Sequence, residues 1–113
     1  MMTPTPTNPY VRYKWMRHNR PSDFLAALKA AVLPPWELTY AAEAASGTDD
    51  ADVIDALLAL TRHASPVVRE GALYGVWHSH EPRVTARIRE MADHDESPAV
   101  RGLAANCVEE MAP

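Results

Sequence analysis

The sequence predicts an all-α protein built from about three stacked helical hairpins. The main observation is an internal duplication in which residues 65–73 (SPVVREGAL) and 97–105 (SPAVRGLAA) align at a spacing of 32 residues. Both copies contain Ser-Pro, Val-Arg and, three places after the arginine, a small residue. A repeat of this length is typical of one supersecondary unit used several times. Apolar residues also recur at helical spacing, and prolines stand where helices should begin or end.

Length and composition favour one small domain with an apolar core. The chain has 113 residues, 47% of them hydrophobic, and no stretch approaches the roughly 18 consecutive apolar residues of a membrane span. The first residues lack the apolar segment of a secretory signal. The only cysteine, Cys107, leaves no basis for a disulfide framework or a cysteine-based zinc site. We therefore expect a cytoplasmic, bacterial-type protein without a membrane partner.

Charge is divided unevenly along the chain. Residues 1–21 contain four cations and no acids, whereas residues 22–113 contain seven cations and fifteen acids. The formal net charge of −4 therefore combines a basic arm of +4 with an acidic body of −8. An acidic body repels nucleic-acid phosphates and favours basic protein partners.

Residues 1–21 are expected to form an N-terminal region apart from the helical domain at 22–113. Residues 1–8 are rich in proline and poor in apolar side chains, which is typical of a flexible tail. Asn8-Pro9 favours a helix start, and Pro21 should end that segment. One helical face would carry Val11, Trp15 and His18. The alternation at 11–15 also permits an extended strand.

The first hairpin is expected to start at Ser22-Asp23, break at Pro34-Pro35 and close at Ser46-Gly47. Its two helices would bury apolar stripes, which are Phe24, Leu25, Leu28 and Val32, then Leu38, Ala41, Ala42 and Ala45.

The second and third hairpins repeat this plan with proline-led helices. Acids near residues 48–50 suit the start of one helix, Ser65-Pro66 opens the next, and Pro82 and Pro98 open the last two. Their expected inward faces are Val53, Ile54, Leu57, Leu58 and Leu60, then Val68, Ala72 and Val76, then Val84, Ile88 and Met91, and lastly Val100, Leu103, Ala104, Cys107, Val108 and Met111.

Residues 95–105 (DESPAVRGLAA) resemble the second half of a HEAT repeat, and residues 65–76 are similar to it as well. The family pattern has a turn aspartate, a proline that opens the second helix, Val-Arg, and small residues that let helices pack closely. The resemblance covers residues 49–111, and more loosely 22–47, where Val-Arg is missing. His63-Ala64 also stands where the turn acid is expected.

This resemblance implies a short right-handed α-solenoid whose second helices line a concave face. From its own residues, the N-terminal arm is expected to form a short capping helix in front of it. HEAT proteins are mostly scaffolds and adaptors, although a few relatives are DNA glycosylases or bilin lyases. The sequence shows no Ser-His-Asp set, Gly-rich phosphate loop or paired carboxylates at metal spacing. We therefore expect no enzymatic activity, no cofactor and no metal.

Aromatic and acidic side chains are expected on the concave face. A turn of about 100° per residue sets Tyr74 and Trp77 together on the outward side of the helix after Pro66. Exposed aromatics of this kind anchor interfaces. With the corresponding positions of the other hairpins, the predicted partner-binding residues are Tyr40, Glu43, Glu70, Tyr74, Trp77, Asn106 and Glu109. Trp77 could equally pack under the neighbouring repeat as core.

These features predict a protein-protein interaction module that binds a basic protein, for example a small inhibitor or immunity-type protein covering a basic nucleic-acid enzyme. The alternative is nucleic-acid binding by the basic arm, where cations and rings alternate and could hold phosphates and stack bases. Its residues would be Arg12, Lys14, Trp15, Arg17 and Arg20. Val11 and Trp15 could equally pack over the first hairpin as a terminal cap.

Three further features have structural interpretations. Gly71 and Gly75, four residues apart on one helix, favour close helix packing. The Val-Arg arginines, Arg69 and Arg101, are expected to pair with Asp95 or Glu96. The sequence His78-Ser79-His80-Glu81 fits a solvated loop between helices better than a metal site.

Overall fold

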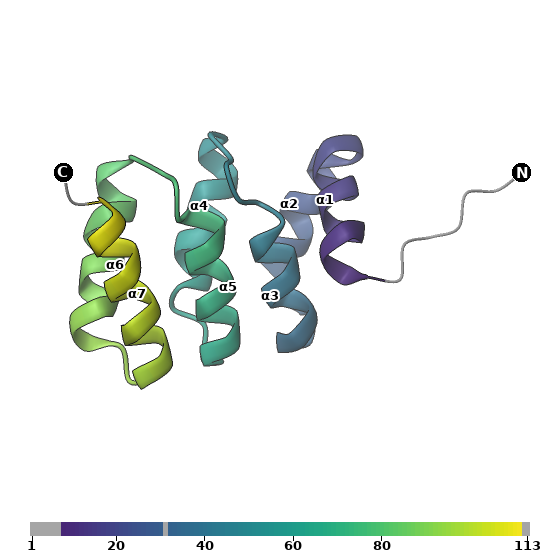
Figure 1. Ribbon diagram of the computed structural model, residues 1–113. Helices are drawn as coiled ribbons and strands as arrows, with labels where there is room; N and C mark the ends of the chain where they lie inside the picture. Colours follow the sequence, from purple (N-terminus) through teal and green to yellow (C-terminus); the bar gives the residue numbers. More distant parts are fainter. Residues whose placement is uncertain (1–7, 31, 112–113) are drawn as a thin grey trace, which may run out of the picture.

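The computed structural model describes residues 8–30 and 32–111, and within these ranges the protein is all-α, with seven helices and no strand (Figure 1). The helices are α1 (Pro9–Asn19), α2 (Pro21–Ala30), α3 (Pro35–Glu43), α4 (Ala51–Leu60), α5 (Pro66–Val76), α6 (Pro82–His94) and α7 (Pro98–Met111). Six of the seven begin with proline, whose fixed φ suits the first helical position and whose missing N–H would be unpaired there. The remaining helix, α4, is capped by the Asp50 carboxylate.

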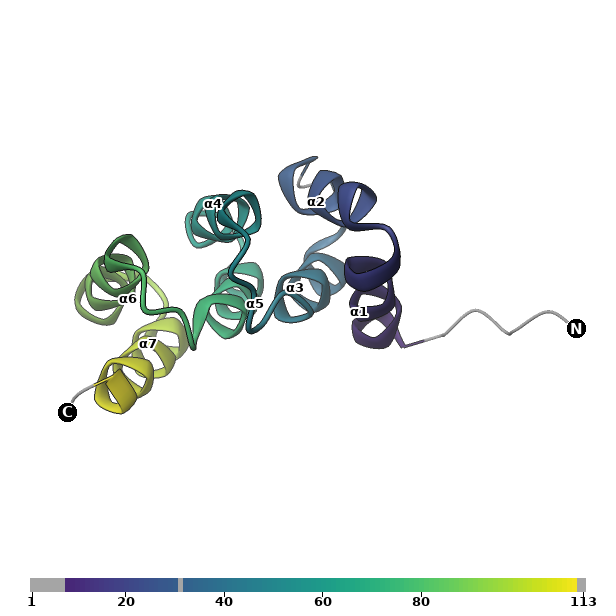
Figure 2. The same cartoon turned by 90° about the horizontal axis from the view of Figure 1, so that it is seen from above.

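The helices form two rows. Helices α2, α4 and α6 lie in one row, and α1, α3, α5 and α7 lie in the other, so that the molecule is elongated, 50 × 25 × 21 Å (Figure 2). The most extensive helix contacts are α3 on α5 and α6 on α7. The second row is bowed, and its free side, which faces the viewer in Figure 1, is shallowly concave. No helix within the described ranges is long and apolar enough to cross a membrane.

The expected helix at the N-terminal arm is confirmed, and the strand alternative is wrong. Asn8 caps α1 through bonds from the backbone N–H groups of Tyr10 and Val11 to its side-chain oxygen. Pro21 was expected to end this segment, but it opens α2, so the expected boundary between residues 21 and 22 falls inside a helix. Residues 1–7 of the expected tail lie outside the described residues.

The face on which α1 packs differs from the expected one. Val11 and Trp15, proposed as capping contacts, are 48% and 53% exposed, whereas Tyr13 is only 4% exposed. The cause is Glu37 of α3, which accepts a hydrogen bond from the Tyr13 hydroxyl at 3.0 Å and pairs with Arg12. These bonds turn Tyr13 inward, and α1 packs on both α2 and α3.

The two glycines of α5 allow it to approach α3 closely, as expected. A Cβ atom on Gly71 would lie 2.6 Å from the Thr39 carbonyl oxygen, and one on Gly75 would lie 2.6 Å from the Ala42 carbonyl oxygen. Either atom would meet the backbone of α3, which cannot move aside cheaply. The α3–α5 contact, on which the position of the concave face depends, therefore requires glycine at both places.

The expected inward residues of the hairpins are largely buried. The core includes Phe24, Leu28, Leu38, Leu57, Val68, Ala72, Val76, Val84, Ile88, Met91, Val100 and Cys107. Burial, with a smaller contribution from the charge of Glu110, raises the pKa of the Cys107 thiol to about 11, so this side chain acts as an apolar core residue. Val32 is an exception, because α2 ends at Ala30 and leaves it exposed.

Candidate functional site

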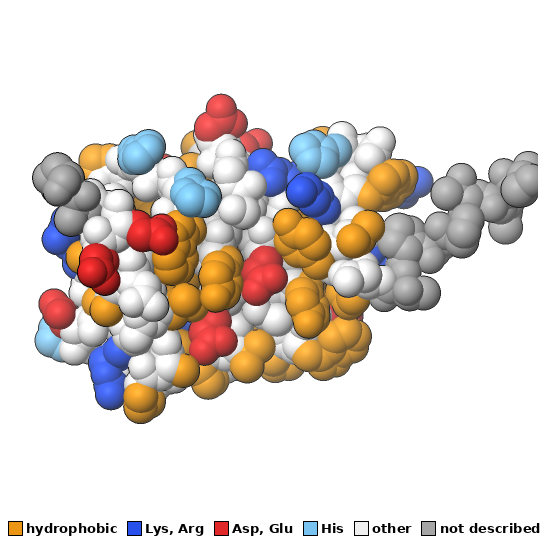
Figure 3. Space-filling view, viewed as in Figure 1, with side chains coloured by type: hydrophobic (Ala, Val, Ile, Leu, Met, Phe, Trp, Pro, Cys, Tyr) orange, Lys and Arg blue, Asp and Glu red, His pale blue; other side chains and the backbone are white. Residues whose placement is uncertain are grey.

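The concave face is formed by the free sides of α3, α5 and α7, and it carries most of the large apolar side chains that the structure exposes. Trp36 and Tyr40 lie one helical turn apart on α3, and Val67 and Tyr74 lie two turns apart on α5. Isolated exposed apolar residues are normal, but a contiguous set on one face indicates an interaction surface. Figure 3 looks onto this face and shows apolar side chains interspersed with carboxylates.

Tyr74 and Trp77 form a stacked aromatic pair on this face, as their i,i+3 spacing predicted. Their ring centroids are 5.6 Å apart and their planes differ by 14°. Tyr74 is 45% exposed, whereas Trp77 is half-buried against the core. The Trp77 indole N–H donates to the Glu110 carboxylate of α7, which fixes the ring orientation. Leu73, the residue before Tyr74, is fully buried in the core.

A groove between α5 and α7 runs beside this aromatic pair. Its cavity volume is about 490 Å³, and its lining residues are Tyr74, Trp77, Leu103, Asn106, Glu109 and Glu110. Four of the predicted partner-binding residues thus line one groove. Sequence reasoning missed Leu103 and Glu110 here, and Trp36 and Val67 elsewhere on the face. The i, i+3, i+7 spacing of Leu103, Asn106 and Glu110 was the available signal.

The other predicted acids, Glu43 of α3 and Glu70 of α5, lie close enough to repel each other. Both are half-buried, and burial, followed by the negative charge of Glu70, raises the pKa of Glu43. Within residues 8–30 and 32–111, neither carboxylate has a hydrogen bond or ion pair with a cation. A cation placed between them would relieve both the desolvation and the repulsion.

Replacing Glu43 by Gln should stabilise the fold. Because the raised pKa means that the folded protein binds this proton more tightly than the unfolded chain, the charged form of Glu43 costs stability at neutral pH. That cost disappears as the pH falls through the folded pKa toward the ordinary value of 4.5. We expect the free energy of unfolding to rise by about 0.5 kcal/mol at pH 7 and to be unchanged at pH 4. Urea unfolding of this variant and of a Glu109→Gln control, which should show no gain, tests this.

The basic arm has fewer available cations than its sequence indicated. Arg12 pairs with Glu37, and Arg17 donates to the carbonyl oxygens of Ala44 and Ser46 at 3.1 and 2.7 Å, at the end of α3. The exposed members of the predicted set are Lys14, Trp15 and Arg20, with Arg20 also 3.8 Å from the Asp23 carboxylate.

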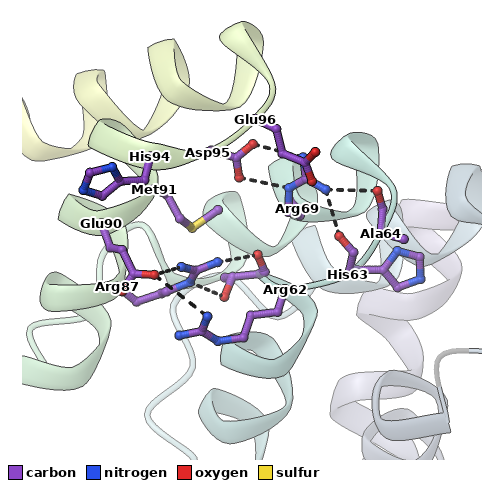
Figure 4. A pocket seen from close by; sticks show the side chains of 11 residues that line it. Arg62, His63, Ala64, Arg69, Arg87, Glu90, Met91, His94, Asp95 and Glu96 are labelled. Atoms are coloured by element: carbon purple, nitrogen blue, oxygen red, sulfur yellow. Dashed lines mark hydrogen bonds and ion pairs between the residues drawn. The ribbon is translucent and has the colours of Figure 1, made fainter.

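A second cavity, of about 280 Å³, lies at the turns that join α4 to α5 and α6 to α7. Figure 4 shows Arg69 at its edge, pointing toward Asp95 on one side and toward His63 and Ala64 on the other. The Arg69 guanidinium donates to both Asp95 oxygens at 2.9 and 3.0 Å and to the carbonyl oxygens of His63 and Ala64 at 2.8 and 3.0 Å. The expected Arg69–Asp95 pair is therefore present.

This network holds two hairpins together. Burial alone would raise the pKa of Asp95, but hydrogen bonds from Arg69 and from the Ser97 backbone N–H outweigh it and lower the pKa. Arg101 was also expected to pair with an acid, but it donates to the backbone carbonyl of Asp95 at 2.6 Å. Arg69 and Arg101 are thus satisfied by fixed protein groups, which indicates a structural role.

His78 and His80 lie exposed in the α5–α6 connection, as expected for a solvated loop. In the part of the chain that the structure describes, no group of three or more His, Cys, Asp or Glu side chains is arranged to hold a metal ion.

No protein-family model matches the chain, and neither the curated proteins nor the solved structures give a significant match. The resemblance to HEAT repeats therefore stays a prediction from the residues. The function has to be inferred from the concave face itself.

Proposed function

We propose that the protein is a non-enzymatic protein-binding module that holds a basic partner on its concave face. The observation that carries this proposal is the partly exposed Tyr74–Trp77 stack in the α5–α7 groove. The same face carries Glu43 and Glu70, whose carboxylates repel each other and have no cationic partner among the described residues. Rigid aromatic rings bury large area at little entropic cost, so they make effective interface anchors. Carboxylates around them speed association with a basic partner and exclude acidic ones.

We further propose that the fold is a short right-handed α-solenoid of HEAT-like repeats, and equivalent contacts in two repeats support this. Arg69 donates to the carbonyl of His63, and Arg101 donates to the carbonyl of Asp95. The second donor and the second acceptor each lie 32 residues after the first. Likewise, His63 Nδ1 accepts from the Ser65 N–H at 3.0 Å, as Asp95 Oδ1 does from the Ser97 N–H at 2.9 Å. His63 thus replaces the missing turn acid.

In this proposal the partner is a basic protein of the cytoplasm, and one concrete form is a stoichiometric inhibitor that covers a nucleic-acid enzyme. Because acidic and aromatic groups dominate the described concave face, this face presents negative charge to the enzyme as nucleic-acid phosphates do, but it is not a substrate that the enzyme can process. The charge of −8 on residues 22–113 is consistent with that role.

Affinity purification from extracts of the source organism, followed by quantitative mass spectrometry, tests this function. At least one basic protein should be retained by the wild-type chain and reduced at least about tenfold by Tyr74→Ala/Trp77→Ala, because interface aromatics of this kind are binding hot spots. Trp15→Ala, which removes an exposed aromatic on α1, is the matched control and should retain it. Equal recovery by the double variant would exclude the concave face as the binding surface.

The nucleic-acid alternative keeps one supporting observation, the exposed Lys14, Trp15 and Arg20 of the arm. It predicts a mobility shift of an oligonucleotide that weakens steeply with salt and disappears in Lys14→Glu/Arg20→Glu. A salt-insensitive shift, or none, would remove it.

A further inference from the structure

Helix α1 has a second face whose side chains are exposed. Val11, Lys14, Trp15 and His18 follow one another at i, i+3, i+4 and i+7, and all four are exposed. The opposite face is occupied, because Tyr13 is buried and bonded to Glu37. We call these four residues the α1 stripe. Two apolar anchors one turn apart, with a cation between them, are the pattern of a helix that docks into a groove.

The chemistry of the α1 stripe is the complement of the α5–α7 groove. The stripe offers an indole and an ammonium group, and no acid occurs anywhere in residues 1–21. The groove offers the Tyr74–Trp77 stack and the carboxylates of Glu109 and Glu110. An indole can stack on the aromatic pair while the ammonium group faces the carboxylates.

The α1 stripe cannot reach the groove of its own chain. Helix α1 packs on α2 and α3 at one end of the second row, whereas the groove lies between α5 and α7 toward the other end (Figure 2). A surface with a basic aromatic end and an acidic aromatic end is, however, complementary to itself after a two-fold rotation.

We infer that the α1 stripe docks in the α5–α7 groove of a second copy of this chain, giving an antiparallel dimer with two identical contacts. This inference rests on the binding role proposed for the groove. The dimer covers Tyr74 and Trp77, so a basic partner must displace α1 from the groove before it binds. Self-association therefore lowers the apparent affinity of the protein for its partner.

Sedimentation velocity over a range of micromolar concentrations, at low and at high salt, tests the contact. The wild-type chain should form dimers that weaken with salt. A variant of the stripe, Lys14→Glu/Trp15→Ala, and a variant of the groove, Tyr74→Ala/Trp77→Ala, should each dimerise at least about tenfold more weakly. Val32→Ala, which removes an exposed apolar side chain outside both surfaces, should dimerise like the wild type. Circular dichroism confirms that each variant is folded.

Mixing the two weakened variants gives the sharper test. The mixture contains one intact stripe and one intact groove, so a one-to-one heterodimer with one of the two contacts should form more tightly than either variant dimerises alone. A monomeric wild-type chain at low salt, or a mixture that stays monomeric, would overturn the inference. An oligonucleotide that binds the monomer through Lys14 and Trp15 would also overturn it and assign the stripe to nucleic acid. None of these results affects the retention of a separate basic partner, which tests the proposed function independently.

Discussion

Replacing Asp95 by Ala should lower the free energy of unfolding by about 4 kcal/mol. The Arg69 and Asp95 side chains are only 7% and 4% exposed, and they share two hydrogen bonds. Removing the carboxylate leaves the guanidinium charge buried with carbonyl oxygens alone, and it also removes the acceptor for the Ser97 N–H. This loss is large against the 5–15 kcal/mol that typically stabilise a domain.

Asp55→Ala is the matched control, because Asp55 and Arg83 form an ion pair whose side chains are both 55% exposed. Solvent screening leaves that pair with little effect on the free energy of unfolding. Urea unfolding of both variants at pH 7 separates the two cases. Equal losses would show that the buried pair does not stabilise the contact between hairpins.

The Asp95 contribution should also depend on pH. Because the pKa of Asp95 is lower in the folded protein than its ordinary value of 3.8, the stability that it supplies is complete above that value and is lost as the pH falls through the folded pKa. The wild type and Asp95→Ala should therefore converge in stability below pH 3.8 and remain far apart at pH 7. A difference in the free energy of unfolding that does not change with pH would contradict the assignment of the Arg69–Asp95 pair.

Replacing Gly71 by Ala should lower the free energy of unfolding by about 3 kcal/mol. The new methyl group would lie 2.6 Å from the Thr39 carbonyl oxygen and 2.8 Å from Thr39 Cα, so α3 and α5 would have to separate. Because α3 and α5 both carry side chains of the concave face, partner binding should weaken as well.

Gly102 of α7 is the matched control for this substitution. A Cβ atom there meets nothing within 4 Å, so Gly102→Ala should gain up to about 1 kcal/mol from helix propensity alone. If the close approach of α3 and α5 is real, thermal or urea unfolding will show that Gly71→Ala lowers the free energy of unfolding and that Gly102→Ala raises it. A gain at Gly71 would contradict it.

The sequence alone correctly predicted the features that depend only on local helix geometry. Proline at the first position of most helices and the 32-residue duplication predicted the helices at Pro66 and Pro98 within a residue of their starts. The i,i+3 spacing also placed Tyr74 beside Trp77, because Trp77, the C-cap residue of α5, keeps helical backbone angles. Helix geometry needs no tertiary information, so these predictions followed from residue order.

The predictions that failed depended on groups far away in the chain. The apolar residues of α1 are spread over all sides of the helix, so their periodicity could not predict which face packs against the core. The packing face is set by Glu37, which bonds Tyr13 from 24 residues further along the chain. Arg17 donates hydrogen bonds at the end of α3 to carbonyl oxygens 27 and 29 residues away. These bonds likewise could not be predicted without knowing where those oxygens lie in the fold.

The central claim, that the concave face binds a basic partner, is tested most directly by fluorine NMR of protein labelled with 5-fluorotryptophan. The three tryptophans report on two surfaces: Trp77 in the α5–α7 groove and Trp36 on α3 belong to the concave face, whereas Trp15 lies on α1. Single Trp→Phe variants assign the resonances. When the recovered partner is added to monomeric protein, the Trp77 resonance should shift and the Trp15 resonance should not. A complex that forms while Trp77 stays unchanged and Trp15 alone responds would contradict the claim.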